Sequence, residues 1–147
     1  MDERFETFTV LINRINRNIR KIKNEEMAVY KLRSVHISCL YYLYTKEGLI
    51  AADLCGKCAE DKATISRAVE YLEANGYLTC ETKESKRYKS PLFLTQKGKE
   101  AGKRIADKIN EVLARISFAM TEAERVDFYR KLTSVSESLE AVAKTYE

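Results

Sequence analysis

Residues 61–78 read DKATISRAVEYLEANGYL and contain the signals for one short helix with a defined start and end. Asp61 is a favourable N-cap, and Gly76 is a typical helix stop. The apolar residues Ile65, Val69 and Leu72 recur at helical spacing between them. When this apolar face is buried, the opposite face of the helix points outward. It carries side chains that can contact bases and phosphates, namely Lys62, Ser66, Arg67 and Glu70.

The flanking segments predict a second short helix and a hairpin. Residues from Ala52 to about Cys58 are expected to be helical and lead directly to Asp61. Residues 77–82 and 92–95 are β-prone, and the polar segment 83–90 lies between them, with Pro91 near the start of the returning strand. Two helices, a tight turn and a hairpin are typical of a winged helix-turn-helix, in which the second helix enters the major groove.

Further helices extend this core on both sides. A helix from about Val35 to Tyr44 is apolar nearly all round and is closed by Gly48. Thr95 can cap a long helix whose inward stripe is Ile105, Ile109, Val112 and Ile116. The fold class is therefore predicted to be mainly α with a small β-hairpin wing.

Both ends of the chain carry an apolar stripe at helical spacing. The N-terminal stripe is Phe5, Phe8, Ile12, Ile15, Ile19 and Ile22. The C-terminal stripe follows a capping box at Thr121–Glu124 and consists of Phe128, Leu132, Val135, Leu139, Val142 and Tyr146. Such stripes need a partner surface, so we hypothesise a homodimer; closure of both stripes on their own subunit is the alternative.

Charge is distributed unevenly along the chain. Between Lys83 and Arg104 there are eight basic and two acidic residues, which gives a net charge of +6. From Thr121 to Glu147 the net charge is −2. The first region is suited to a polyanion such as nucleic acid, and the C-terminal region is not.

The sequence resembles the MarR (multiple antibiotic resistance regulator) family of bacterial and archaeal regulators. Residues 61–78 are similar to the family's recognition helix, and Leu94-Thr95-Gln96-Lys97-Gly98 is similar to its L-T-x-x-G motif. The resemblance implies a single domain over residues 1–147, with dimerisation helices at about 1–24 and 96–147. The winged helix-turn-helix lobe would span about 32–95, and each subunit would present it to half of a near-palindromic operator.

The resemblance implies a set of DNA-binding residues: Lys62, Thr64, Ser66, Arg67, Lys86, Arg87 and Lys89. The family's wing often has Asp-x-Arg, and the position of that Arg is Tyr88 here. We assign its minor-groove role to Arg87, with Lys86 and Lys89 as phosphate partners. A solvated helix face and hairpin tip is the alternative. A second departure is Ala51, where a Ser or Thr cap is common in the family.

Cys55-Gly56-Lys57-Cys58 has the C-x-x-C spacing of redox and zinc motifs. No second pair follows, His36 is the sole histidine, and no βαβ pattern surrounds the motif, so we predict no metal and no cofactor. Cys55 and Cys58 can pack as small apolar residues or act as a thiol sensor; metal binding is the third alternative and would need the distant Cys39, Cys80 or His36, or carboxylates. His36 is expected to be a hydrogen-bonded core residue.

These observations favour a sequence-specific, DNA-binding transcriptional regulator over an enzyme, because no catalytic triad or phosphate loop is readable. The resemblance implies a small aromatic or lipophilic effector, and tyrosines cluster where it would bind, at Tyr30, Tyr41, Tyr42 and Tyr44. Without a signal peptide or membrane span, a cytoplasmic location is expected. The alternatives are a thiol-sensing regulator using Cys55 and Cys58, a dithiol oxidoreductase and a helical interaction module that does not bind DNA.

Overall fold

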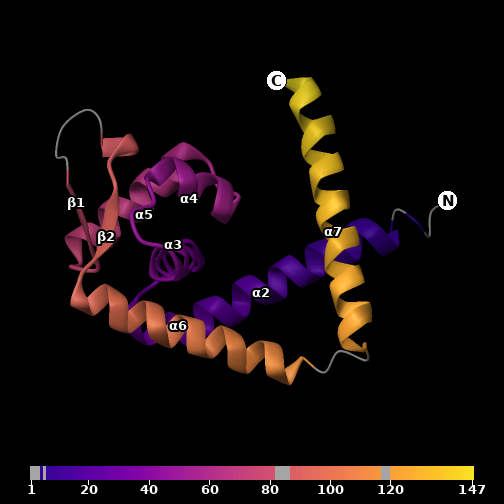
Figure 1. Cartoon of the computed structure of the whole chain (residues 1–147), viewed down its shortest axis with the longest axis horizontal. Coiled ribbons are helices and arrows are strands. Elements are labelled where there is room, and N and C mark those ends of the chain that lie inside the picture. The colour runs from indigo at the N-terminus through magenta and orange to yellow at the C-terminus, as the bar shows by residue number, and fades with distance from the viewer. Residues whose placement is uncertain (1–3, 5, 82–86, 117–119) are drawn as a thin grey trace. The chain divides into compact units, whose positions relative to one another are not determined.

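Helices and one two-stranded hairpin make up the described part of the chain, which is residues 4, 6–81, 87–116 and 120–147 of a computed structural model (Figure 1). Contacts divide the chain into two units, Met1–Ile109 and Asn110–Glu147. The mainly α fold with a hairpin wing, predicted from the sequence, is confirmed. The elements are a π-helical turn (Glu6–Val10), α2 (Leu11–Met27), a 3-10 turn (Ala28–Tyr30), α3 (Ser34–Thr45), α4 (Ala51–Cys58), α5 (Lys62–Ala74), β1 (Leu78–Cys80), a 3-10 turn (Arg87–Lys89), β2 (Leu92–Leu94), α6 (Gln96–Arg115), α7 (Glu122–Ala143) and a 3-10 turn (Lys144–Tyr146).

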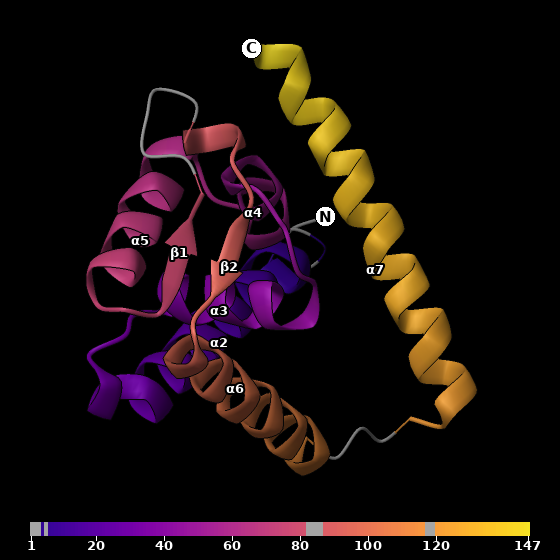
Figure 2. The same ribbon diagram turned by 60° about the vertical axis from the view of Figure 1, so that its left-hand side comes forward.

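The core of the first unit is built around α3. Cys39 and Leu40 have no exposed surface, and Ile37 and Leu43 are nearly as buried. Helices α2, α4 and α5 and strand β2 all pack against α3, and Figure 2 shows it behind the hairpin. A helix that is apolar nearly all round is expected to be central, and α3 is.

Helices α4 and α5 form the predicted helix-turn-helix pair. Ile65 and Leu72 of α5 are fully buried, and the Asp61 side chain accepts a hydrogen bond of 2.7 Å from the Thr64 N–H. Helix α4 begins at Ala51, one residue earlier than predicted, with Ile50 as its N-cap. Asp53 accepts a 2.9 Å hydrogen bond from the Ile50 N–H. A carboxylate inside α4 therefore satisfies a backbone donor at this helix start, where the family's Ser or Thr cap is missing.

The hairpin is shorter than the sequence predicted. Strands β1 and β2 pair antiparallel with Leu78 opposite Leu94, Thr79 opposite Phe93 and Cys80 opposite Leu92. The Leu92 N–H donates a hydrogen bond of 2.9 Å to the Leu49 carbonyl, so the segment before α4 is also bonded to β2. Leu78 and Leu92 are buried, which attaches the base of the wing to the core.

The junction between β2 and α6 is tightly packed. Thr95 caps α6 as predicted: its Oγ1 accepts from the Gly98 N–H at 3.1 Å and donates to the Gly76 carbonyl at 2.6 Å. A Cβ atom on Gly98 would lie 1.9 Å from the Tyr77 carbonyl oxygen, so only glycine fits there. The inward stripe of α6 is buried at Ile105 but becomes more exposed toward the end of the helix.

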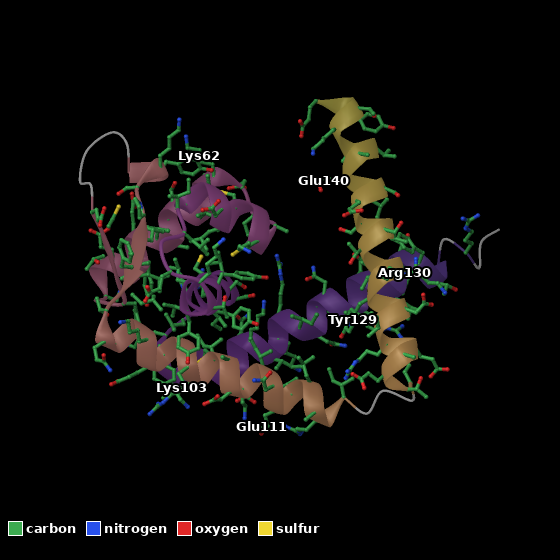
Figure 3. The ribbon with its side chains drawn as sticks, viewed as in Figure 1. Lys62, Lys103, Glu111, Tyr129, Arg130 and Glu140 are labelled. Carbon is green, nitrogen blue, oxygen red and sulfur yellow. The ribbon has the colours of Figure 1, made fainter. Side chains whose placement is uncertain are left out.

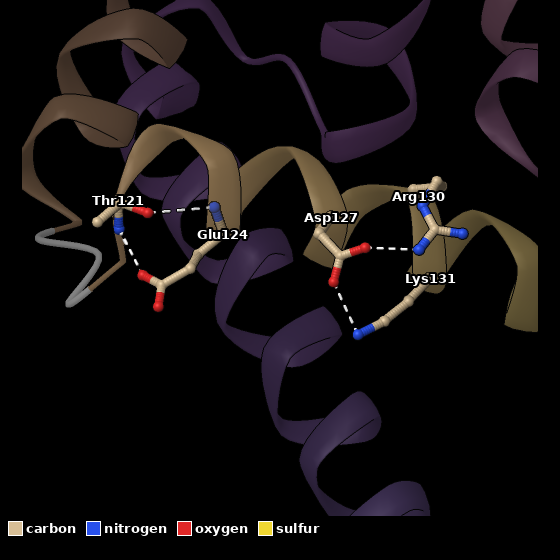
Figure 4. A network of polar contacts seen from close by, with 5 residues as sticks. All are labelled: Thr121, Glu124, Asp127, Arg130 and Lys131. Atoms are coloured by element: carbon tan, nitrogen blue, oxygen red, sulfur yellow. Dashed lines mark hydrogen bonds and ion pairs between the residues drawn. The ribbon is translucent and has the colours of Figure 1, made fainter.

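Helix α7 dominates the second unit and has the predicted capping box. The Thr121 N–H donates to Glu124 at 2.7 Å, and the Glu124 N–H donates to Thr121 at 3.3 Å. Asp127 forms ion pairs with Arg130 at 2.6 Å and Lys131 at 2.7 Å (Figure 4). Not one residue of α7 is buried.

Both apolar stripes are exposed within their units. The stripe on the N-terminal helical segment retains 41% to 53% of its surface from Phe8 to Ile22, and Phe5 lies outside the described residues. The stripe on α7 retains 38% to 55% from Phe128 to Val142. No described helix is long and apolar enough to span a membrane. The expected division into dimerisation helices and a DNA-binding lobe remains a prediction.

Candidate nucleic-acid interface

The outer face of α5 carries the side chains that the sequence placed there. Lys62, Arg67 and Glu70 are exposed, whereas Thr64 and Ser66 are half-buried. Figure 3 shows Lys62 at the start of α5, pointing away from the core. The Thr64 backbone N–H donates a hydrogen bond to the Asp61 side chain, which fixes Thr64 in the first turn of α5. The exposed face thus has two cations and one carboxylate available to a ligand.

Tyr88 connects the wing to this face. Its hydroxyl lies 3.2 Å from the Cys55 sulfur in α4, and the Lys62 ammonium lies 4.5 Å from the centre of its ring. The contact between the Lys62 ammonium and the Tyr88 ring restricts the movement of both side chains. Tyr88 therefore helps to fix the Lys62 side chain and the turn Arg87–Lys89 against the helix-turn-helix. In the sequence, Tyr88 stands out only as a departure from the Arg of the MarR wing. The one available signal was an aromatic residue in a polar tip.

The predicted wing residues are described only in part. Lys89 is exposed in the turn Arg87–Lys89, which packs against α4. Lys86 and the side chain of Arg87 lie outside the described residues. The structure therefore brings the turn containing Lys89 close to the start of α5, through Tyr88.

Several basic residues after the wing have partners within the protein. Lys97 donates 2.7 Å to the Asn75 carbonyl and lies 4.3 Å from the centre of the Tyr77 ring. Lys103 pairs with Asp107 at 2.8 Å, and Arg104 donates to the Tyr30 hydroxyl. Asp107, which lies outside residues 83–104, offsets the charge of Lys103, so the +6 of that segment overstates the charge that is available to a polyanion.

The two cysteines of the C-x-x-C motif have different partners. The Cys55 sulfur lies 3.2 Å from the Tyr88 hydroxyl, whereas the half-buried Cys58 interacts electrostatically with Cys39 of α3. Among the described residues, no group of three or more His, Cys, Asp or Glu side chains is arranged to hold a metal ion.

A small pocket of about 150 Å³ lies among α2, α3 and α6. Lys23 donates a 3.0 Å hydrogen bond to Ser38 at its polar side. Two of the four clustered tyrosines line it, among the residues Lys23, Ile37, Ser38, Tyr41, Tyr42 and Ile109. Tyr44 instead lines a larger depression of about 320 Å³ beside β2.

Several solved structures with the same architecture are MarR family regulators. A MarR family transcriptional regulator from Silicibacter pomeroyi is 26% identical, with a TM-score of 0.73 over 85% of this chain and 84% of that one. A MarR family regulator from Listeria monocytogenes, in complex with a 26mer DNA, is 27% identical, with a TM-score of 0.76 over 87% and 85%. This chain has the fold of the MarR family of transcriptional regulators.

A MarR family regulator from Neisseria meningitidis has a TM-score of 0.82 over 98% of this chain and 99% of that one, at 19% identity. The family resemblance predicted from residues 61–78 and 94–98 is therefore confirmed over nearly the whole chain. The sequence itself matches no family model and no curated protein. The MarR relationship of this chain is thus much clearer in three dimensions than in sequence.

Proposed function

We propose that this MarR-family chain is a cytoplasmic transcriptional regulator that binds double-stranded DNA through α5 and the wing. The observation that carries the proposal is the pair of exposed cations, Lys62 and Arg67, on the outer face of a well-anchored α5. An exposed helix face of this kind fits the major groove, and the wing beside it reaches the backbone or minor groove. The DNA complex of the Listeria regulator, which has the same fold, supports this mode.

We further propose that the functional unit is a homodimer on a near-palindromic operator. The exposed stripes on α2 and α7 supply apolar surface that a monomer would leave in water. A twofold dimer presents two copies of α5 to two half-sites related by the same symmetry.

The test is a titration of DNA upstream of the protein's own gene with wild-type protein and an Arg67→Ala variant. If Arg67 reads a base, the variant loses roughly 1 to 3 kcal/mol of binding free energy and discriminates less at that base. Arg125→Ala removes the same charge from an exposed position on α7 and is expected to bind like wild type. Equal affinity for Arg67→Ala and wild type would exclude this role.

A small aromatic or lipophilic effector is proposed for the pocket between Lys23 and Tyr42. Its volume of about 150 Å³ is below the usual size of drug sites, which limits the ligand to a single small ring or short chain. The pocket combines aromatic walls with one ammonium group, so binding of a small aromatic acid, measured by calorimetry, is expected to be lost in Tyr42→Ala.

A further inference from the structure

One side chain of the turn Arg87–Lys89 contacts both helices of the helix-turn-helix. The Tyr88 hydroxyl lies 3.2 Å from the Cys55 sulfur on α4, and the Lys62 ammonium lies 4.5 Å from the centre of the Tyr88 ring. Lys62 is the first residue of α5, and the turn itself packs against α4. Tyr88 therefore connects the returning side of the wing to α4 and to the start of α5.

Lys62 differs from Lys97, the other lysine held over a ring near the wing. Lys97 lies 4.3 Å from the centre of the Tyr77 ring, and its ammonium also donates a hydrogen bond of 2.7 Å to the Asn75 carbonyl. Among the described residues, no hydrogen bond or ion pair accompanies the ring contact of the exposed Lys62 ammonium. An aromatic ring covers one side of an ammonium group, so the N–H groups on its other side stay available to an anion.

The place of Lys62 in the fold suits a phosphate of the DNA backbone. Lysine side chains and helix N-termini are common phosphate contacts in protein–DNA complexes, and Lys62 combines a cation with the first turn of α5. A mobile lysine loses rotamer freedom when it binds a phosphate, which lowers the affinity. The Tyr88 ring already restricts Lys62 in the free protein, and the contact with Cys55 holds the ring from the α4 side.

We propose that Tyr88 is a positioning residue for DNA binding, which holds the Lys62 ammonium in place for a backbone phosphate. This consequence rests on the proposed DNA-binding function, whereas the geometry does not. A phosphate contact carries no sequence information, so the contribution of Tyr88 is expected to be the same on any duplex. Arg67, if it reads a base, would contribute mainly on the operator.

Nuclear magnetic resonance of the free, full-length protein tests the geometry without DNA. Protons above an aromatic ring are shielded, so the Hε signals of Lys62, identified by their loss in Lys62→Arg, are expected upfield in wild type. Tyr88→Phe keeps the ring and should keep this shift, whereas Tyr88→Leu should abolish it. The signals of Lys97 over the Tyr77 ring are the control and should not respond to Tyr88→Leu. An unshifted Lys62 in wild type, or a shift that survives Tyr88→Leu, would overturn the proposal.

DNA titrations followed by fluorescence anisotropy test the consequence. The probes are the duplex from upstream of the protein's own gene and a shuffled duplex of the same length and composition. The dissociation constant of Tyr88→Leu is expected to be roughly 3- to 10-fold higher than that of Tyr88→Phe on both probes. With Lys62→Ala added to both variants, the two constants should become equal, because the ring then has no ammonium to hold. Tyr88→Leu retains the Lys62 charge and should keep the wild-type salt dependence, whereas Lys62→Ala should lose about one phosphate contact.

The remaining outcomes separate positioning from other roles of Tyr88. Equal affinities of folded Tyr88→Leu and Tyr88→Phe would overturn the proposal, and so would a difference that persists without Lys62, since that indicates a general effect on the wing. Tighter binding by Tyr88→Leu would also overturn it, because the ring would then withhold Lys62 from DNA. Circular dichroism verifies that each variant is folded. If wild type binds neither duplex, the proposed function itself fails, whereas failure of the positioning role alone leaves wild-type DNA binding intact.

Discussion

His36 is the only histidine of the chain, and its ring is part of the core. Its Nδ1 accepts a 3.0 Å hydrogen bond from the Arg33 N–H at the start of α3, and its ring stacks on Tyr71 with centroids 4.4 Å apart. Burial, followed by the charge of Arg33, lowers the pKa of His36 from 6.5. The expectation of a hydrogen-bonded core histidine is confirmed.

Stability is therefore predicted to fall on mild acidification. As the pH falls through about 6.5, the unfolded chain takes up a proton on His36 that the folded chain resists, so the stabilising contribution is present above this pH and lost below it. Thermal unfolding followed by circular dichroism should show a lower Tm at pH 5.5 than at pH 7.5. His36→Asn keeps a hydrogen-bond acceptor but does not titrate, so it should flatten this dependence. An equal fall in both proteins would assign the effect to other groups.

Two helical glycines, Gly98 in α6 and Gly56 in α4, differ in the space available for a side chain. In α6, a methyl group on Gly98 would collide with the Tyr77 backbone oxygen, whereas one on Gly56 in α4 meets nothing within 4 Å. Gly98→Ala is predicted to reduce the free energy of unfolding by about 1–3 kcal/mol, because backbone must move. Gly56→Ala should raise it by up to about 1 kcal/mol through helix propensity. Urea titrations measure both, and a stable Gly98→Ala would contradict the close packing.

The elements also show what sequence periodicity can and cannot predict. The buried face of α5, the Asp61 cap and the Thr121 capping box were predicted because their partners lie within four residues. The contact of Cys55 with Tyr88 was not, since it joins positions 33 residues apart. Local spacing made the C-x-x-C motif look like one pair, but the tertiary fold places the Cys55 sulfur against the Tyr88 hydroxyl.

At the scale of the whole molecule, the two apolar stripes are not covered by the described residues of their own units. Helical periodicity predicted both of them, yet periodicity cannot distinguish a surface that binds a second copy from one that binds the same chain. Within the described residues of each unit, neither stripe is buried. The energetic argument for a dimer starts from the gain of about 1.5–3 kcal/mol for fully burying an exposed isoleucine. The stripe isoleucines retain 41% to 53% of their surface, so each would gain roughly half of that amount, and a stripe offers several.

A single charge in the stripe on α2 tests this argument. Ile15→Glu places a carboxylate in the proposed interface, whereas Asn13→Glu introduces the same charge on the other side of α2, and both positions are exposed. Each substitution occurs twice in a twofold dimer, so Ile15→Glu should raise the dimer dissociation constant at least about a hundredfold. Asn13→Glu should leave it unchanged. Sedimentation equilibrium of wild type and both variants measures the dissociation constants. A wild-type monomer at micromolar concentration would refute the dimer and favour the alternative that both stripes are buried within one subunit.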